Sequence, residues 1–325
     1  MNLLVTGGYG FIGSHFVEQQ VIAGNKVFVW DLMTYAASFK NIPTEIASEI
    51  YFTQVDISDS SQVRSAASQL DSIDWIVNFA AESHVDQSIR NPLKFISSNV
   101  LGTVNLLELN RTGIASKFFQ VSTDEVYGSS EDGSWTEESI LNPRSPYSAS
   151  KAAAEHFVNA YRETYSIPCI VSRCANNYGP RQSLEKLIPK IIWKLKNLES
   201  VPIYGDGLNS REWIDVKQHV NSISELISAS AKDEVDGVYN IAGVERNNLQ
   251  IVNEIAEIMG IDIPRIEFVA DRLGHDRRYA MSDNKIKLLL NTTQPTNTSL
   301  VLAETVEWYL QNPEWVQDSL SKIKP

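Results

Sequence analysis

The fold of this chain is decided near its start, by the stretch Asn2-Leu3-Leu4-Val5-Thr6-Gly7-Gly8-Tyr9-Gly10-Phe11-Ile12-Gly13. Residues 3–5 are apolar and suit a short buried strand, whereas residues 14–23 have the pattern of a helix that ends at Gly24. Three glycines, spaced three residues apart, join the strand to the helix. A tight glycine turn at this point lets the helix N-terminus bind a phosphate, because its free N–H groups and its dipole point there. The stretch therefore predicts the first unit of a dinucleotide-binding domain.

Apolar runs and helical stretches then alternate along the first half of the chain. The apolar runs cover residues 27–30, 50–55, 75–81 and 118–122, and the helical patterns cover residues 61–70, 93–109 and 149–165. This alternation predicts an α/β fold of the Rossmann type, with a doubly wound parallel sheet and right-handed crossovers. It loosens after about residue 175. The later helical patterns lie at 184–198, 248–259 and 300–310, and the later strands at 201–207 and 238–242.

The 325 residues are enough for one large domain and a smaller one. We expect a nucleotide-binding Rossmann domain over residues 1–175, to which short segments near 214–243 return. Residues 176–325 are expected to form mostly a discontinuous α+β lobe that binds the substrate.

The bulk composition restricts the partners of the chain. A formal net charge of -12 argues against non-specific binding to nucleic acid or to an anionic membrane. The two cysteines, Cys169 and Cys174, form neither a disulfide framework nor a zinc spacing, so we expect free thiols in a reducing cytosol and no metal. The sequence shows no signal-peptide pattern and no apolar run near the roughly 18 residues that span a bilayer. A cytoplasmic location is therefore expected.

A candidate cofactor site follows the glycine turn. Asp31 ends the second predicted strand, 18 residues after Gly13. A carboxylate there can accept hydrogen bonds from a ribose diol and repels a 2′-phosphate, which favours NAD over NADP. The alternative is that Asp31 only caps a turn. Asp56 and Ile57 suit the adenine edge, and the small residues of Phe79-Ala80-Ala81 leave room for the dinucleotide.

Tyr147 and Lys151 form a candidate pair for hydride chemistry. They are four residues apart on a predicted helix and so share one face. A phenol is a poor base at its ordinary pKa of about 10. A neighbouring ammonium stabilises tyrosinate, so Lys151 is expected to lower the pKa of Tyr147 and make it a base for an alcohol proton. The alternative is a plain core tyrosine.

Thr123-Asp124-Glu125 directly follows the predicted strand at 118–122. In open α/β sheets the ligand crevice lies beyond the carboxyl ends of the strands. The threonine hydroxyl can bind a sugar oxygen. Oxidation of a sugar at C4 makes its C5 proton acidic, so one carboxylate can remove that proton while a carboxylic acid protonates the departing C6 hydroxyl. Because successive side chains of a strand point oppositely, both carboxyls reach a substrate only if the chain turns here.

Six motifs carry a resemblance that extends over nearly the whole chain. They are Thr6-Gly7-Gly8-Tyr9-Gly10-Phe11-Ile12-Gly13-Ser14-His15, Ala80-Ala81-Glu82-Ser83-His84-Val85-Asp86, Ser122-Thr123-Asp124-Glu125-Val126-Tyr127-Gly128, Asn176-Asn177-Tyr178-Gly179-Pro180, Glu185-Lys186-Leu187-Ile188-Pro189 and Gly274-His275-Asp276-Arg277-Arg278-Tyr279. With them the chain resembles the sugar-nucleotide branch of the extended short-chain dehydrogenase/reductase family, and within it the 4,6-dehydratases that act on dTDP-glucose.

The resemblance implies a lyase that holds NAD through each cycle and forms a 4-keto-6-deoxy sugar nucleotide. Tyr147 would be the base for C4 oxidation, with Lys151 as its partner and Thr123 beside them. Asp124 would be the acid that releases water from C6, and Glu125 the base at C5. Hydride would then return to C6.

The resemblance also implies a set of binding residues. The cofactor site would comprise Gly7, Gly10, Phe11, Ile12, Gly13, Asp31, Leu32, Thr34, Asp56, Ile57, Phe79, Ala80, Ala81, Ser83, Ser98, Tyr147, Lys151 and Asn177. The substrate site would comprise Ser83, Thr123, Asn176, Lys186, Leu187, Pro202, Tyr204, Arg211, Asn248, Arg272 and His275. Arg211 and Arg272 suit a diphosphate clamp, because guanidinium groups bind phosphate oxygens bidentately.

Two departures leave the nucleotide base open. The segment 129–145 is shorter than in many bacterial relatives, and Leu273 stands where proline is usual. A UDP-glucose 4,6-dehydratase is therefore an alternative. A 4-epimerase or decarboxylase of the same family also oxidises C4 but typically lacks a Thr-Asp-Glu triplet, and a non-catalytic NAD-binding scaffold or sensor is an alternative of another class. The family commonly forms homodimers through helices that correspond to residues 93–109 and 149–165.

Overall fold

The computed structural model describes residues 1–230, 235–291 and 298–323. Its centre is a seven-stranded parallel sheet with the strand order β10-β6-β5-β4-β1-β2-β3. The strands are β1 (Asn2–Thr6), β2 (Lys26–Asp31), β3 (Ile50–Gln54), β4 (Ile73–Asn78), β5 (Ala115–Thr123), β6 (Cys169–Cys174) and β10 (Gly237–Ile241). The predicted Rossmann-type sheet is confirmed.

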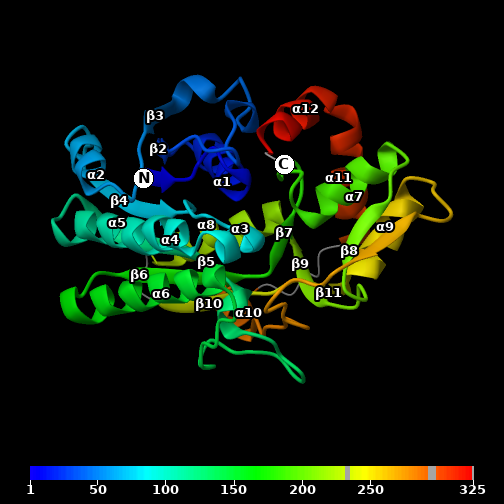
Figure 1. The fold of residues 1–325 in the computed structure, drawn as a ribbon. Coiled ribbons are helices and arrows are strands. Elements are labelled where there is room, and N and C mark those ends of the chain that lie inside the picture. Colours follow the sequence, from blue (N-terminus) through cyan, green and yellow to red (C-terminus); the bar gives the residue numbers. More distant parts are fainter. Residues whose placement is uncertain (231–234, 292–297, 324–325) are drawn as a thin grey trace.

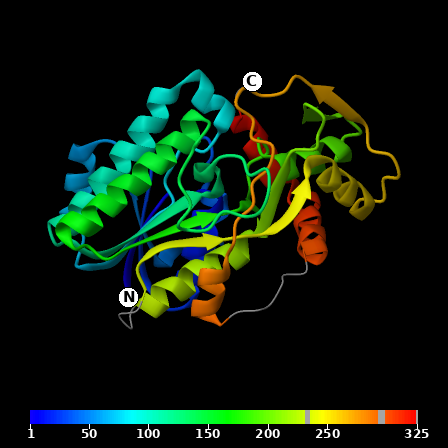
Figure 2. The ribbon, with the colours of Figure 1, turned by 90° about the horizontal axis from the view of Figure 1, so that it is seen from below.

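Helices cover both faces of this sheet (Figures 1 and 2). They are α1 (Phe11–Ile22), α2 (Ser60–Ala67), α3 (Val85–Arg90), α4 (Pro92–Phe95), α5 (Gly102–Arg111), α6 (Pro146–Tyr165) and α8 (Val216–Ser230). Side chains of β1 alternate between the two faces, with Leu3 and Val5 packed in the cluster that includes α1 and α8, and Leu4 in the cluster that includes α2 and α5. A parallel sheet buried on both faces explains why its strands are almost continuously apolar.

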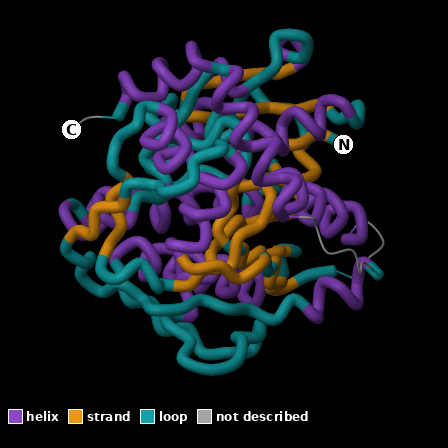
Figure 3. Tube along the Cα trace, turned by 90° about the vertical axis from the view of Figure 1, so that its right-hand side faces the viewer, coloured by secondary structure: helices purple, strands orange, loops and turns teal. Residues whose placement is uncertain are grey.

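The remaining elements form a smaller lobe beside the sheet (Figure 1). The lobe contains β7 (Asn176–Tyr178), β9 (Ser210–Asp215) and β11 (Val244–Asn247) in one sheet, and β8 (Val201–Tyr204) paired with β12 (Ile266–Val269). Its helices are α7 (Leu187–Lys196), α9 (Asn248–Ile258), α11 (Thr298–Gln311) and α12 (Pro313–Lys322). These four helices share a hydrophobic cluster. Figure 3 shows the strands inside a layer of helices, with long loops along the lower edge.

Contacts tie the lobe to the main sheet. α8 and β10 bring the chain back to the sheet after β9, although residues 231–234 within this expected returning segment lie outside the described residues. α10 (Asn284–Leu290) packs on β10. At the C-terminal end, the Trp315 indole donates to Asn41 Oδ1 at 2.8 Å and so binds α12 to the segment after β2. Among the described residues, no helix is long and apolar enough to cross a membrane.

Several predicted element boundaries were wrong. β6 was not predicted, because its polar residues Ser172 and Arg173 hid a strand that is buried throughout. The strand predicted at 75–81 ends at Asn78, so Phe79-Ala80-Ala81 forms a loop beyond it. The helix predicted at 14–23 begins at Phe11. Residues 93–109 are not one regular helix, since a π-helical segment at Ile96–Leu101 separates α4 from α5.

Gly13 is the tightest point of the first turn. A Cβ at Gly13 would lie 2.2 Å from the carbonyl oxygen of Gly7. We expect Gly13→Ala to lower the free energy of unfolding by about 3 kcal/mol, because an overpacked backbone must shift. Gly113→Ala is the matched control, since Gly113 has φ +81° with open space around its Cβ position and should cost only about 1 kcal/mol. Urea titrations compare the two, and equal losses would contradict the close approach.

Candidate active site

The glycine turn after β1 is shaped for a phosphate. Gly7 has φ +70°, and a Cβ there would lie 2.7 Å from the backbone nitrogen of Ala80. Gly10 is the N-cap of α1, and no side chain caps this end of the helix. The first N–H groups of α1 therefore remain available to an anion, as the dinucleotide motif requires. Phe11 and Ile12 form the start of that first turn.

Asp31 at the end of β2 is held in a fixed orientation. Its Oδ2 accepts from the backbone nitrogen of Tyr9 at 3.0 Å, and its Oδ1 accepts from that of Met33 at 2.8 Å. Burial raises the pKa of the Asp31 carboxyl. Asp31 does cap the turn that continues into Leu32 and Thr34, as the alternative proposed. Each carboxylate oxygen nevertheless keeps a second lone pair, so the same group still fits a ribose diol.

Other predicted cofactor residues lie at the ends of neighbouring strands. Asp56 Oδ1 accepts from both the nitrogen and the hydroxyl of Ser58, at 2.9 and 2.7 Å. Ile57 packs against Gly102, where a Cβ would meet its side chain at 2.7 Å. Phe79 donates its backbone N–H to the carbonyl of Thr6 at 3.0 Å, which brings the loop after β4 to the glycine turn. The residues present thus fit a dinucleotide.

For two further predicted cofactor residues, Ser98 and Asn177, the position in the structure gives less direct support. Ser98 lies in the π-helical segment and is half-buried. The Asn177 side chain is committed to the protein, because its Oδ1 lies 2.9 Å from His219 Nδ1 and its Nδ2 donates to the Ala175 carbonyl at 3.0 Å. The predicted nicotinamide-side contact of Asn177 therefore stays a prediction.

Helix α6 carries the predicted hydride pair. Ser145 caps it with a capping box that includes Ser148, and Pro146 occupies its first turn, so Tyr147 lies just inside the helix. Lys151 follows one turn later and donates from Nζ to the Val121 carbonyl at 2.6 Å. Both side chains are buried.

The pKa values of this pair differ from the expectation. Burial raises the pKa of the Tyr147 phenol well above its ordinary value, and the charges of Glu125 and Cys174 add to that shift. The expected lowering by Lys151 was therefore wrong for the chain alone, because burial of the phenol outweighs any effect of the lysine charge. Burial lowers the pKa of Lys151 to about 8, so this group remains largely cationic at neutral pH.

The chain turns immediately after Thr123, as a shared role for the two carboxyls requires. Thr123 ends β5 with extended backbone, and residues Asp124–Tyr127 form a short 3₁₀ helix. The Thr123 hydroxyl accepts from the Glu125 backbone nitrogen at 3.3 Å and donates to Asp124 Oδ1 at 3.1 Å. The Thr123 hydroxyl also opposes the rise in the pKa of the Tyr147 phenol, so the two side chains are close together. Thr123 therefore links the two halves of the predicted catalytic set.

Asp124 and Glu125 have different surroundings. Asp124 is 1% exposed, and its buried Oδ2 has no hydrogen-bond partner in the described part of the chain. Burial, followed by the charge of Glu125, raises the pKa of Asp124 to about 7. Burial also raises the pKa of Glu125, but the charges of Arg272, Arg211 and Lys186 oppose that rise. Asp124 is therefore suited to hold a proton and Glu125 to accept one.

Cationic side chains gather near Glu125 from three segments. Arg211 on β9 is oriented by the carbonyls of Ser210 and Asp276, at 2.7 and 2.9 Å. Lys186, just before α7, donates to the Ser83 carbonyl at 2.9 Å. Arg272 lies 3.9 Å from Asp86. These positions favour an anionic group at the mouth of the site.

The remaining predicted substrate residues surround this cationic region from the lobe. Tyr204 donates to Asp86 Oδ2 at 3.1 Å, and His275 Nδ1 lies 2.6 Å from Asp271 Oδ1. Pro202 lies in β8, Leu187 begins α7, Asn248 begins α9, and Asn176 begins β7. Leu273, the departure before the Gly-His-Asp-Arg-Arg-Tyr motif, is 79% exposed.

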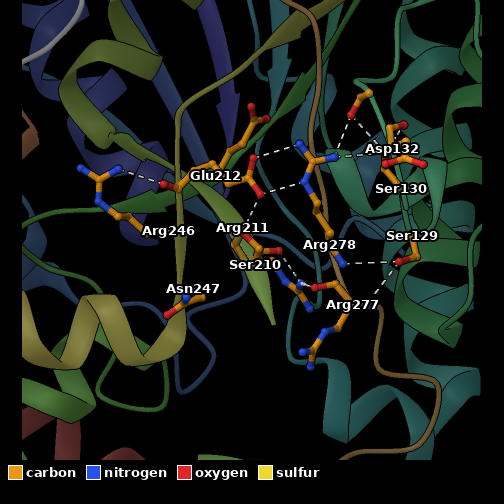
Figure 4. Close-up of polar contacts among 12 residues, drawn as sticks. Ser129, Ser130, Asp132, Ser210, Arg211, Glu212, Arg246, Asn247, Arg277 and Arg278 are labelled. Carbon is orange, nitrogen blue, oxygen red and sulfur yellow. Dashed lines mark hydrogen bonds and ion pairs between the residues drawn. The ribbon is translucent and has the colours of Figure 1, made fainter. Parts of the chain in front are cut away.

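The shortened segment 129–145 is fastened to that motif. Arg277 and Arg278 lie between β9 residues and Ser129 and Ser130 (Figure 4). The Ser129 hydroxyl accepts from the Arg277 nitrogen at 3.1 Å, and Arg278 donates to the Gly133 carbonyl at 2.7 Å. This mouth of the site is therefore held to the lobe by polar contacts.

Sequence reasoning missed three residues of this region. Asn99 binds the backbone of Glu82 and the Ser150 hydroxyl, and so fixes the loop after β4 to α6. The Arg211 guanidinium lies over the ring of Tyr279, and its Cζ is 4.3 Å from the centroid of that ring. Glu212 is buried, and burial raises its pKa to about 8, with Asp124 adding to the shift. Tyr279 belongs to one of the six motifs, whereas Asn99 and Glu212 are isolated residues that no sequence pattern marks.

The described residues include no cluster of three or more His, Cys, Asp or Glu that could hold a metal ion. Cys169 and Cys174 are free and buried.

Comparison with known proteins identifies the family. A family model described as GDP-mannose 4,6 dehydratase matches residues 4–305. The low-salt glycan biosynthesis protein Agl12 of Haloferax volcanii is 44% identical over 292 residues, which cover 89% of this chain and 92% of that protein. A dTDP-glucose 4,6-dehydratase of Xanthomonas campestris pv. campestris is 41% identical, with 98% of this chain and 95% of that protein covered.

A solved structure has the same fold over nearly the whole chain. The crystal structure of DesIV, a dTDP-glucose 4,6-dehydratase from Streptomyces venezuelae with NAD and TYD bound, matches with a TM-score of 0.92 and 40% identity. The match covers 98% of this chain and 100% of that chain. Because the family model and these relatives span most of its length, the chain belongs to the GDP-mannose 4,6 dehydratase family.

Proposed function

We infer that this chain is an NAD-dependent hydro-lyase that converts dTDP-glucose to the 4-keto-6-deoxy sugar nucleotide. The observation that carries this inference is a pair of adjacent carboxyls, Asp124 and Glu125, that turn together beside Tyr147 and have different surroundings. Full-length relatives named dTDP-glucose 4,6-dehydratase support the substrate. When bound, NAD supplies the hydride acceptor for C4 and the hydride donor for C6.

The first chemical role belongs to Tyr147. In its phenolate form it takes the proton of the C4 hydroxyl, and Thr123, whose hydroxyl opposes the rise in the pKa of the phenol, orients the sugar oxygen. Lys151 supplies positive charge one helical turn away. Asp31 and the glycine turn hold the adenosine half of the dinucleotide.

Elimination of water then uses the two carboxyls. The C4 ketone makes the C5 proton acidic, and Glu125 accepts it. Asp124 gives its proton to the C6 hydroxyl, so that the C6–O bond breaks and water leaves. Arg211 and Arg272 bind the diphosphate, and their charges oppose the rise that burial causes in the pKa of Glu125. Solved structures that match this chain also include UDP-glucose 4-epimerases, and epimerisation at C4 leaves the C6 hydroxyl in place, so the elimination defines the activity.

Incubation with dTDP-, UDP- and CDP-glucose tests the function and the base preference together. We expect a 4-keto product, detected by its alkali-induced absorbance, most rapidly from dTDP-glucose. A product that retains its C6 hydroxyl would instead indicate an epimerase. NAD binding with no turnover of any hexose nucleotide would indicate a non-catalytic scaffold.

A homodimer and a cytoplasmic location are further parts of the proposal. Large apolar side chains stand exposed on the helices predicted to form the interface, among them Leu93, Ile96, Leu101 and Phe157 at 71%, 52%, 47% and 43%. A second copy of the chain would cover them. Free buried cysteines agree with a reducing compartment. We expect sedimentation equilibrium of the wild-type protein to give twice the mass of one chain. The double variant Leu93→Glu with Ile96→Glu should give the mass of a monomer. A monomeric wild-type protein would contradict the dimer.

Asp124 should impose an alkaline limit on elimination. Its acid form is the active one, and its pKa is raised to about 7, so the rate should fall as pH rises through that value. Well above it, the protonated fraction falls about tenfold per pH unit. Rapid-quench measurement of water elimination from dTDP-glucose checks this. Asp124→Asn should be slow at every pH and lack that limb, with C4 oxidation retained; an unchanged limb would assign it to another group.

Glu125→Gln separates the base from substrate binding. The amide cannot accept the C5 proton, so incorporation of solvent deuterium at C5 should fall at least about a hundredfold, the scale of general-base catalysis. The dissociation constant for dTDP-glucose should change little, because the substituted amide retains the shape of the side chain. Mass spectrometry and calorimetry measure the two quantities. Deuterium incorporation at the wild-type rate would remove Glu125 from this role.

A further inference from the structure

Glu155 lies on the same buried face of α6 as the hydride pair. Tyr147, Lys151 and Glu155 follow one another at intervals of four residues, so they lie one above the other along the helix. Glu155 is 4% exposed. The proposed mechanism gives this carboxylate no role, although it stands one turn from the lysine that has one.

The Glu155 carboxylate joins α6 to two neighbouring strands. Its Oε2 accepts from Arg173 Nε and Nη2 at 2.9 and 2.7 Å, and its Oε1 accepts from the Ser122 hydroxyl. Ser122 on β5 and Arg173 on β6 are paired across the sheet. One carboxylate therefore holds both strands where they approach the active site.

These contacts reach both ends of the turn that carries Asp124 and Glu125. Ser122 is two residues before Asp124, where that turn begins. Tyr127 is its last residue, and its hydroxyl accepts from Arg173 Nη1 at 2.7 Å while the guanidinium lies 4.7 Å from its ring centroid. Lys151 holds Val121, the residue before Ser122. The turn is thus fastened to α6 through consecutive strand residues at its start and through Arg173 at its end.

We propose that Glu155 is a positioning residue for both halves of the reaction, an inference that rests on the proposed function. It fixes the Asp124–Tyr127 turn relative to Tyr147, and its carboxylate places a negative charge one helical turn from Lys151. It touches no substrate in this role and acts through Ser122, Arg173 and Lys151.

The electrostatic effect of Glu155 on Lys151 supports the second part of the proposal, which concerns the Glu155 charge. Burial lowers the pKa of Lys151, and the charge of Glu155 is the larger of the two influences that oppose this, the other being Cys174 on β6. Removal of the Glu155 charge therefore deprotonates Lys151 at a lower pH. The titration of Lys151 therefore reports the effect of the Glu155 charge directly, whereas a buried ion pair is in general weak evidence for stability.

Two variants separate position and charge from folding. Glu155→Gln alone leaves the Arg173 charge buried without its partner, so its Tm should fall. Glu155→Gln with Arg173→Gln removes both charges, and its Tm should recover. We expect kcat to stay at least about tenfold low in the double variant with little change in KM, because the lost interaction acts on the reacting geometry. If kcat recovered together with Tm, the Glu155–Arg173 pair would serve only to stabilise the fold, and the proposal would be overturned.

A titration of Lys151 tests the charge without any substrate. NMR of lysine-labelled protein, with Lys151→Arg to assign the signal, should show the Lys151 pKa lower by about one unit in Glu155→Gln than in wild type. An unchanged Lys151 pKa overturns the proposal. This readout is independent of turnover, so failure of the proposed function, seen as a wild type without 4-keto product, is distinguished from failure of the role of Glu155.

A cavity beside Glu155 permits a rescue experiment. The cavity has a volume of about 420 Å³, and Glu155, Arg173 and Val158 are among the residues that line it. Formate or acetate should enter it in Glu155→Ala, bind Arg173 and restore kcat severalfold, whereas chloride at equal ionic strength should not. Glu163→Ala is the matched control, since Glu163 lies on the same helix with its side chain 66% exposed. Rescue by chloride as strong as by formate would contradict a carboxylate-specific role.

Discussion

The hydrogen bond from the Lys151 ammonium to the Val121 carbonyl is the contact on which the candidate site depends. It joins the helix that carries Tyr147 to the strand that ends in Thr123. Because Tyr147 is one turn before Lys151 and Thr123 is two residues after Val121, this bond sets the group proposed for oxidation beside the groups proposed for elimination. It also directs the lysine charge to the backbone, which leaves burial to dominate the pKa of the phenol.

The local charge of the site opposes the charge of the whole chain. The formal net charge is -12, yet Arg211, Arg272 and Lys186 all act on Glu125. Backbone carbonyls accept hydrogen bonds from the Arg211 guanidinium. Because a carbonyl carries no formal charge, these contacts orient the arginine without neutralising it. A fixed guanidinium binds a diphosphate with little ordering cost. An acidic protein can therefore place three cationic side chains around one carboxyl, which overall composition does not reveal.

The sequence was sufficient for every strand of the main sheet except β6, because apolar runs and glycine spacing are local patterns. The Tyr147–Lys151 interval is also local, and it predicts where the chemistry lies. The path after Thr123 was not predictable, since a strand pattern alone does not show that Asp124 begins a 3₁₀ turn. β6 was missed for a physical reason. A charged residue such as Arg173 usually marks the end of a strand. Within the fold, however, its guanidinium is buried against Glu155, which lies 18 positions away in the chain. Pairings of that kind arise only in three dimensions.

The tasks proposed for the two adjacent carboxyls, Asp124 and Glu125, rest on their different contacts. Asp124 points one oxygen to the Thr123 hydroxyl and keeps the other buried without a partner among the described residues, so ionisation there is costly. Glu125 lies one residue further along the turn and faces three cationic side chains, so its ionised form is favoured more. An acid and a base can thus be made from neighbouring residues, provided that the turn is held rigidly. Rigidity at this turn is therefore as much a condition for elimination as the carboxyls themselves.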